Sequence, residues 1–198
     1  MAANPQGKGL VPILEAWHGV QAAAVEAKTA RHIIRDYFTG LLVLSAEFNF
    51  KPCLGVAYYL YHSNEQQHRQ CWKLSLIAPA EWGEHAPGPC LGRCELNTDM
   101  TWQLTIEQDV ESKPELVAAL QQFHDGFIDL LDRDHTLEEG LPFFVANLPY
   151  YRLLFSAGLA GSLSRSMALS SLQGTSSKGW LAGLPHRPLV LVNKEPLL

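Results

Sequence analysis

The sequence predicts an α+β fold with N-terminal helices, a central antiparallel sheet of three or more strands, and a C-terminal helical layer. Two changes in the spacing of apolar residues predict this arrangement. The first and last thirds of the chain place apolar residues three and four apart, as helices do, whereas the middle third alternates them every second residue, as strands do. Lys51-Pro52 marks the first change, and the segment around Pro114 marks the second.

The N-terminal helices are expected within residues 11–46. Alanines give this region high helix propensity: Ala22, Ala23, Ala24 and Ala27. Apolar side chains in residues 33–44 recur three and four apart and form a stripe that would face a core. Gly19 and Gly40 weaken the two stretches, so the region is either two helices or one kinked helix.

The middle third predicts an antiparallel hairpin over residues 56–78. Its first strand places alternate side chains on opposite faces: Val56, Tyr58, Leu60 and His62 on one, Ala57, Tyr59 and Tyr61 on the other. A wholly polar loop, residues 63–70, leads to a second strand over residues 72–78, which Pro79 ends. A third strand is expected between residues 91 and 105.

The second half of the chain returns to helical spacing. Ser112 and Glu115 have the spacing of a capping box, and Pro114 stands where the first turn of a helix tolerates proline. The apolar residues that follow form one face of an expected helix: Leu116, Leu120, Phe123, Phe127, Leu130 and Leu131.

A last helical region is expected from residue 141 to residue 172, after a second box-like pair, Thr136 and Glu139. Its apolar part contains Arg152, whose charge is costly inside a membrane, so buried helices are expected instead of a membrane span. Small residues would let another helix approach closely: Ser156, Gly158, Ala160 and Gly161. The same region could assemble with itself or with another protein.

A chain of 198 residues suits one domain. Residues 1–172 are expected to form a single globular domain. Residues 173–198 are punctuated by glycine and proline and are expected to be a mobile or partner-docking tail. Within this tail, residues 188–193 could add an edge strand.

The composition narrows the class of protein. Apolar residues are 47% of the chain, which is enough for a core of ordinary size. The formal charge is −5, with 15 Lys and Arg against 20 Asp and Glu, and this balance argues against nucleic acid as a partner. The chain start lacks the apolar run of a secretory signal, so a cytoplasmic location with reduced thiols is expected.

Cys90 and Cys94, with His85 nearby and Cys71 on a neighbouring strand, raise the question of a zinc site. Zinc ligands usually occur as tightly spaced pairs, and this spacing is loose. Strand alternation instead predicts that Cys90 and Cys94 share one face as small apolar side chains. The sequence therefore predicts no metal site and no cofactor.

The candidate site lies around two acid–tryptophan pairs. Glu81 and Trp82 follow the second strand, and Asp99 and Trp102 lie on or near the third. Such acids could bind a cationic or aromatic ligand, or one could serve as a general base with a raised pKa, with Arg93 as a basic partner. Alternatively, the tryptophans close the edge of the core and the acids bond loop amides. The candidate residues are Tyr59, Tyr61, Glu81, Trp82, Arg93, Asp99 and Trp102.

Four short runs carry a resemblance to a known family: Tyr-Leu-Tyr at 59–61, LIAPAEWG at 76–83, Leu-Gly at 91–92 and Asp-Met-Thr-Trp at 99–102. The chain resembles a family of proteins of unknown function that is found in bacteria, with a more divergent relative in a small human open-reading-frame protein. The bacterial type is similar over nearly the whole chain, including NPQGKGLVP. The human type has non-cysteine residues in place of Cys90 and Cys94, which counts further against zinc. The resemblance implies no activity, cofactor or catalytic residue.

Three functions remain open. The leading hypothesis is a non-enzymatic cytosolic module that binds a protein or a small molecule through the aromatic face of the sheet. The second is a small enzyme that uses Glu81 or Asp99 as a general base. The third is a helical subunit that forms a homo-oligomer or another assembly through residues 141–172.

Overall fold

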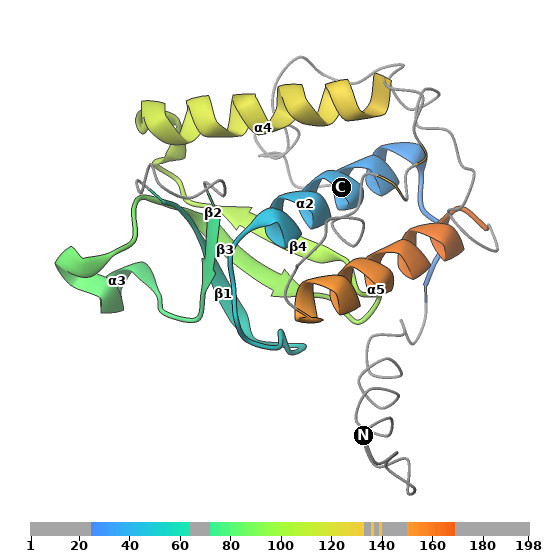
Figure 1. The fold of residues 1–198 in the computed structure, drawn as a ribbon, viewed down its shortest axis with the longest axis horizontal. Helices are drawn as coiled ribbons and strands as arrows, with labels where there is room; N and C mark the ends of the chain where they lie inside the picture. Colours follow the sequence, from blue (N-terminus) through green and yellow to red (C-terminus); the bar gives the residue numbers. More distant parts are fainter. Residues whose placement is uncertain (1–24, 64–71, 133–135, 137–138, 140–149, 169–198) are drawn as a thin grey trace, which may run out of the picture.

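The computed structural model describes residues 25–63, 72–132, 136, 139 and 150–168 (Figure 1). Its strands are β1 (Ala57–His62), β2 (Trp72–Ser75), β3 (Cys90–Leu96) and β4 (Trp102–Ile106). Its helices are α2 (Ala30–Ser45), α3 (Pro79–Trp82), α4 (Pro114–Asp132) and α5 (Tyr150–Ser166), with single turns η1 (Gly83–His85) and η2 (Val110–Ser112). The α+β class predicted from the sequence is confirmed.

The four strands form one antiparallel sheet in the order β2-β1-β3-β4. α2 lies across one face of this sheet, and α4 and α5 flank α2 (Figure 1). The aromatic rings of Phe38 on α2 and Phe127 on α4 meet edge to face, with centroids 5.1 Å apart. The opposite face of the sheet, called the open face below, bears the exposed residues Lys73, Arg93 and Thr105.

The core lies between α2 and the sheet. Tyr58, Leu60 and Leu74 belong to it, whereas Tyr59 and Lys73, one position along each strand, do not. This pattern confirms the alternation predicted for the first hairpin, because successive side chains of a strand point to opposite faces.

α2 is the central helix, and every residue from Asp36 to Leu44 is buried. Thr29 begins the helix by accepting a hydrogen bond from the His32 N–H at 3.4 Å. The helix passes Gly40 without interruption, because Gly40 lets α5 approach: a β-carbon there would collide with the Leu159 side chain. The glycine that weakened the prediction of a helix is therefore a packing position between two helices.

A bulge changes the faces of β3. Leu60 is opposite Gly92 and Tyr61 is opposite Cys90, so Leu91 is an extra residue. Cys94 consequently belongs to the core, whereas Cys90 lies beside Tyr61 on the open face. The prediction that Cys90 and Cys94 share one face is wrong, because an inserted residue reverses the alternation on one side of it.

Two strand boundaries differ from the prediction. β2 ends at Ser75 instead of Ala78, because the Ile77 N–H donates to the Ser75 hydroxyl at 3.1 Å and leaves the strand. The region expected to hold a third strand holds two, β3 and β4. A turn separates them, in which Met100 adopts φ of 66° and the Asn97 N–H donates to the Thr101 carbonyl.

The helices of the second half are largely as predicted. α4 begins at Pro114, and Thr136 and Glu139 exchange the two hydrogen bonds of a capping box, at 2.8 and 3.4 Å. α5 ends at Ser166 and does not continue unbroken to residue 172, because Ala168 adopts φ of 56°.

Several predictions concern residues outside the described part of the chain. These are the helix before residue 25, the loop 64–71, the apolar residues 141–149 and the tail 173–198. Within the described ranges, none of the helices combines the length and the apolar character needed to cross a membrane.

Candidate functional site

The seven candidate residues occupy three places in the fold. The first place is the open face with the adjoining α3, the second is the core, and the third is the β3–β4 turn. The open face and α3 hold Tyr59, Tyr61, Glu81, Trp82 and Arg93. Trp102 lies in the core, and Asp99 lies in the β3–β4 turn.

Tyr59 and Arg93 are neighbours across the open face, since they are directly opposite each other in the pairing of β1 with β3. Tyr59 is half-buried and Arg93 is exposed. Arg93 forms an ion pair with Glu95 at 2.7 Å, with about half of each side chain in solvent. Such an exposed pair adds little stability, so Arg93 is available to a partner at small cost.

Tyr61 is fully buried although it lies on the open face, because the segment after β2 folds over it. Its hydroxyl donates to the Ile77 carbonyl at 2.8 Å, and its ring meets the Trp82 ring edge to face, with centroids 6.5 Å apart. Burial raises the pKa of Tyr61, so the phenol stays protonated and keeps donating. Tyr61 is thus the support for this segment.

The segment that covers Tyr61 buries none of its own helical residues: neither α3 nor η1 contains a buried side chain. It also exposes two large aliphatic residues, Leu76 at 52% and Ile77 at 38%. We call the surface formed by Tyr59, Leu76, Ile77 and Trp82 the Leu76 patch. Burial of apolar surface is the main favourable term in protein association, and the Leu76 patch leaves such surface exposed to solvent.

The sequence pointed to Tyr59 and Trp82 but missed Leu76 and Ile77. The predicted second strand ran through residue 78 and so included Leu76 and Ile77, whereas β2 ends at Ser75. One local signal could have corrected this: Ser75, whose hydroxyl can accept a hydrogen bond from a nearby main-chain N–H.

Glu81 and Trp102 fit the alternative that the acids bond loop amides and the tryptophans close the core. The exposed Glu81 carboxylate accepts from the Ala78 N–H at 3.3 Å. Trp102 is only 2% exposed and packs edge to face on Tyr58, at 5.9 Å between centroids.

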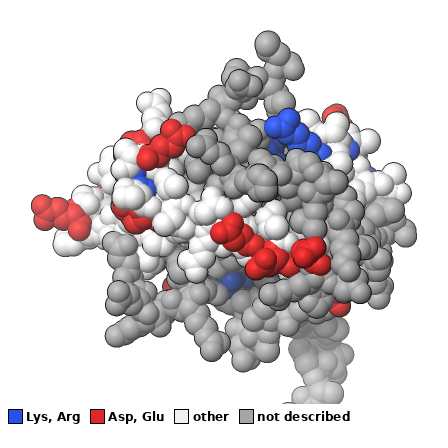
Figure 2. All heavy atoms as spheres, turned by 90° about the horizontal axis from the view of Figure 1, so that it is seen from above, with Lys and Arg blue, Asp and Glu red and all other residues white. Residues whose placement is uncertain are grey.

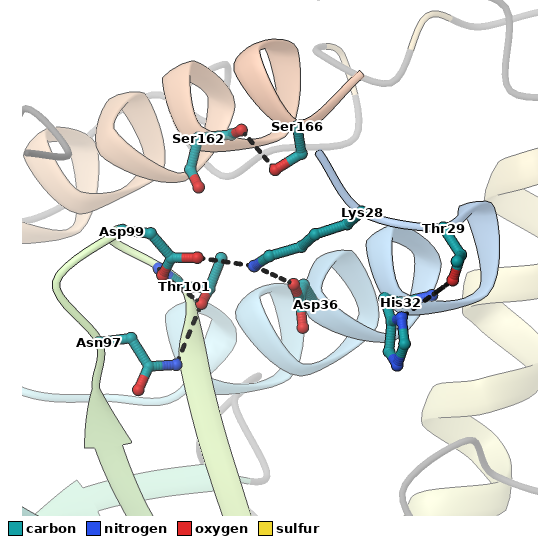
Figure 3. A network of polar contacts seen from close by, with 9 residues as sticks. All are labelled: Lys28, Thr29, His32, Asp36, Asn97, Asp99, Thr101, Ser162 and Ser166. Carbon is teal, nitrogen blue, oxygen red and sulfur yellow. Dashed lines mark hydrogen bonds and ion pairs between the residues drawn. The ribbon is translucent and has the colours of Figure 1, made fainter. Parts of the chain in front are cut away.

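Asp99 belongs to a polar network at the β3–β4 turn (Figure 3). The Lys28 ammonium donates to Asp99 at 2.6 Å and to Asp36 of α2 at 2.7 Å. The other oxygen of Asp99 accepts from the main-chain N–H and the hydroxyl of Thr101, at 3.1 and 2.6 Å. The main-chain N–H of Lys28 also donates a hydrogen bond to the Ser166 carbonyl at the end of α5. Lys28 therefore joins the residues before α2 to the sheet and to α5.

The charges in this network hold each other ionised. Burial alone would lower the pKa of Lys28, but its hydrogen bonds to Asp36 and Asp99 outweigh burial and raise it. Burial alone would raise the pKa of Asp99, but the bonds from Lys28 and Thr101 outweigh it and lower the pKa. A general base near neutral pH needs a raised carboxyl pKa, so this environment suits a structural ion pair.

Glu81 and Asp99 lie near opposite ends of β3. Trp82, next to Glu81, contacts Tyr61, which is opposite Cys90 at the start of β3. Asp99 follows the end of the same strand. Since a strand rises about 3.3 Å per residue, this separation is roughly 20 Å. The two carboxylates do not share one site.

The described residues contain no group of three or more His, Cys, Asp or Glu side chains that could hold a metal ion. Burial raises the pKa of Cys90 to about 11, and burial also raises the pKa of Cys94. Both side chains are therefore neutral thiols at physiological pH, and neither is set up as a nucleophile.

In the described part of the region proposed for assembly, residues 150–168, most apolar side chains pack against the chain's own core. α5 contributes Leu154, Phe155, Leu159 and Leu163 to the core. Tyr150, at its start, is 42% exposed.

Fold and site together define an α+β protein whose helices cover one face of an antiparallel sheet and whose Leu76 patch lies on the other side. The chain belongs to the family described as protein of unknown function (DUF2452), whose model matches residues 21–126, just over half of the chain. The matched region runs from before α2 into α4 and includes all seven candidate residues. No curated protein and no solved structure matches the chain.

Proposed function

We propose that this chain is a non-enzymatic cytosolic binding module that holds a partner protein on the Leu76 patch. The observation that carries the proposal is the exposure of Leu76 and Ile77 on a segment that Tyr61 supports from below. The seven-residue site of the sequence analysis is thereby reduced to Tyr59, Trp82 and the neighbouring Arg93, with the two aliphatic residues added.

The energetics favour a protein partner. Full burial of a leucine or isoleucine side chain contributes roughly 1.5–3 kcal/mol, so burial of the exposed part of Leu76 and Ile77 contributes about 1 kcal/mol each. Trp82 and Tyr59 add amphipathic aromatic surface, and Arg93 can exchange its weak ion pair for a contact across an interface. Tyrosine, tryptophan and arginine are the residue types in which interface binding energy concentrates.

Charge and thiol chemistry support the rest of the proposal. Acidic side chains gather on the face seen from above in Figure 2, and Asp125, Asp129 and Asp132 are exposed residues of α4. Such a face repels a phosphate backbone, which argues against nucleic acid. Cys53, Cys90 and Cys94 are free thiols, as expected in a reducing compartment.

The binding hypothesis is favoured over the enzyme hypothesis by the state of the two carboxylates. Glu81 is held by a main-chain N–H and Asp99 by Lys28, and Arg93 pairs with Glu95 instead of either. No described arrangement gives Glu81 or Asp99 a second catalytic group.

Site-specific photo-cross-linking in cells that produce the full chain tests the proposal. A benzophenone amino acid is placed at Leu76 and, as a matched control, at Leu54, which is 48% exposed. The proposal expects a discrete cross-linked protein at position 76 that is absent at position 54. Equal cross-linking at both positions, or none at position 76, would refute it.

Binding measurements with the purified proteins then give the contribution of Leu76 and Ile77 to the binding free energy. In complex with the cross-linked protein, the double variant Leu76→Ser with Ile77→Ser should lose about 2 kcal/mol of binding free energy, roughly a thirtyfold rise in Kd. Leu54→Ser should leave Kd unchanged.

A further inference from the structure

We propose that the outer edge of β4, which no described strand covers, pairs with β4 of a second copy of the chain, antiparallel and about a twofold axis through Leu104. This surface lies at the opposite edge of the sheet from β2 and the Leu76 patch. It is independent of the proposed function, and both surfaces can be occupied at once.

The pairing of β3 with β4 fixes which main-chain groups are free. The Asn97 N–H donates to the Thr101 carbonyl at 2.9 Å, and the Glu107 N–H donates to the Leu91 carbonyl at 3.0 Å. In an antiparallel pair, every second residue bonds to the neighbouring strand. Gln103 and Thr105 therefore bond to β3.

The intervening residues of β4 point their N–H and C=O groups away from β3. They are Trp102, Leu104 and Ile106. No other backbone segment in the described ranges bonds to these groups. The result is a row of three donors and three acceptors along the edge of the sheet.

The other edge of the sheet is closed. The Glu47 N–H donates to the Trp72 carbonyl at 2.8 Å, and the Leu74 N–H donates to the Glu47 carbonyl at 3.0 Å, so the chain itself covers β2. Natural sheets also discourage edge pairing with charged residues, proline or bulges. β4 has the sequence WQLTI, with no charged residue and no proline. Among the residues that the structure describes, β2 has such a cover and β4 has none.

A second copy fits this edge because β4 is self-complementary about its central residue. With Leu104 opposite Leu104 of the second copy, Trp102 is opposite Ile106, and all outward donors and acceptors of both strands pair. Gln103 is then opposite Thr105, so no like charges meet. The half-buried Leu104 and Ile106 gain apolar contacts on the helix-covered face.

The contact is small. Stable protein interfaces usually bury at least about 1,200 Å², and a five-residue edge alone provides less. We therefore expect a weak dimer that dissociates on dilution. Its surface differs from the residues 141–172 considered for assembly in the sequence analysis.

Analytical ultracentrifugation of the full chain over a range of concentrations tests the dimer. Two variants change the same exposed residues and differ only in charge pattern. Gln103→Lys with Thr105→Lys places like charges opposite each other across the twofold axis and should raise Kd at least tenfold. Gln103→Lys with Thr105→Glu places opposite charges there and should lower Kd. Thermal unfolding of both variants shows that the fold is retained.

A further variant separates this surface from α5. Tyr150→Ser should leave the dimer unchanged, whereas it should weaken a dimer formed through residues 141–172. The proposal is overturned if the chain and the opposite-charge variant both stay monomeric up to millimolar concentration. It is equally overturned if the chain dimerises and neither β4 variant changes Kd.

Discussion

Removal of the Lys28 ammonium should destabilise the fold by about 2 kcal/mol. The Lys28 side chain is 23% exposed, and its partners Asp36 and Asp99 are 12% and 17% exposed. Breaking a fully buried ion pair costs about 3–5 kcal/mol, whereas breaking a surface pair costs about 0–1 kcal/mol. Lys28→Met leaves two partly buried carboxylates without their shared cation, so the cost should fall between these limits.

Urea unfolding of the full chain measures this cost. Lys51→Met is the matched control, because Lys51 is exposed and should change the free energy of unfolding by less than about 0.5 kcal/mol. A cycle of Lys28→Met, Asp99→Asn and the double variant should give a coupling energy of about 1 kcal/mol. A loss below about 0.5 kcal/mol for Lys28→Met would refute the role given to the network.

The pH dependence of the same difference has a defined sign. The pKa of Asp99 is lowered from 3.8, so its contribution is complete above that value and is lost as pH falls through the folded-state pKa. The pKa of Lys28 is raised from 10.5, so its contribution is complete below that value and is lost as pH rises through the folded-state pKa. The stability gap between the wild type and Lys28→Met should be widest between these two values and narrow outside them.

Three further predictions concern single sites. Gly92→Ala should lower the free energy of unfolding by about 1–3 kcal/mol, because the added β-carbon would meet the backbone of β4. Gly126→Ala, which has open space around it on α4, should raise the free energy of unfolding by about 0.5–1 kcal/mol. Urea unfolding measures both changes. Tyr61→Phe removes a buried hydrogen bond and should speed amide hydrogen exchange in α3 but not in α4. Iodoacetamide should label the exposed Cys53 much faster than the buried Cys90 at pH 8, as measured by peptide mass spectrometry; equal rates would contradict the burial of Cys90.

The sequence predicted the parts of the fold that depend on periodicity. Alternation around Tyr58 and Leu60 predicted the faces of β1, and helical spacing after Pro114 predicted α4. Both patterns reflect burial of one face of a regular element, and this burial is visible in a single segment of sequence.

The features missed depend on contacts between distant segments. The bulge at Leu91 reverses the face of Cys90. Gly92 beside it is a local signal, because a glycine inside a strand often marks a bulge, but it does not say which residue is inserted. Lys28 looks like an ordinary charged residue until the fold brings Asp99, 71 positions away, to its ammonium. The alternation in residues 91–105 continues on both sides of the turn at Met100, so periodicity alone did not reveal two strands.

The sequence also predicted only part of the candidate site, because the exposure of its residues depends on contacts between distant segments. Composition and strand pairing directed attention to Tyr59 and Trp82, which lie at the Leu76 patch. Trp102 is also a tryptophan close to an acidic residue in the sequence, but its side chain lies on the helix-covered face of the sheet and is buried in the core. The exposure of Leu76 depends on where β2 ends, and a hydrogen bond to the Ser75 hydroxyl decides that point.

Hydroxyl-radical footprinting tests the binding surface most directly, by comparison of the purified chain with the chain inside cells. Oxidation of Leu76, Ile77 and Trp82 should fall several-fold inside cells, while oxidation of Leu54 stays at the level of the purified chain. Unchanged oxidation of Leu76 and Ile77 inside cells would contradict a partner on this surface.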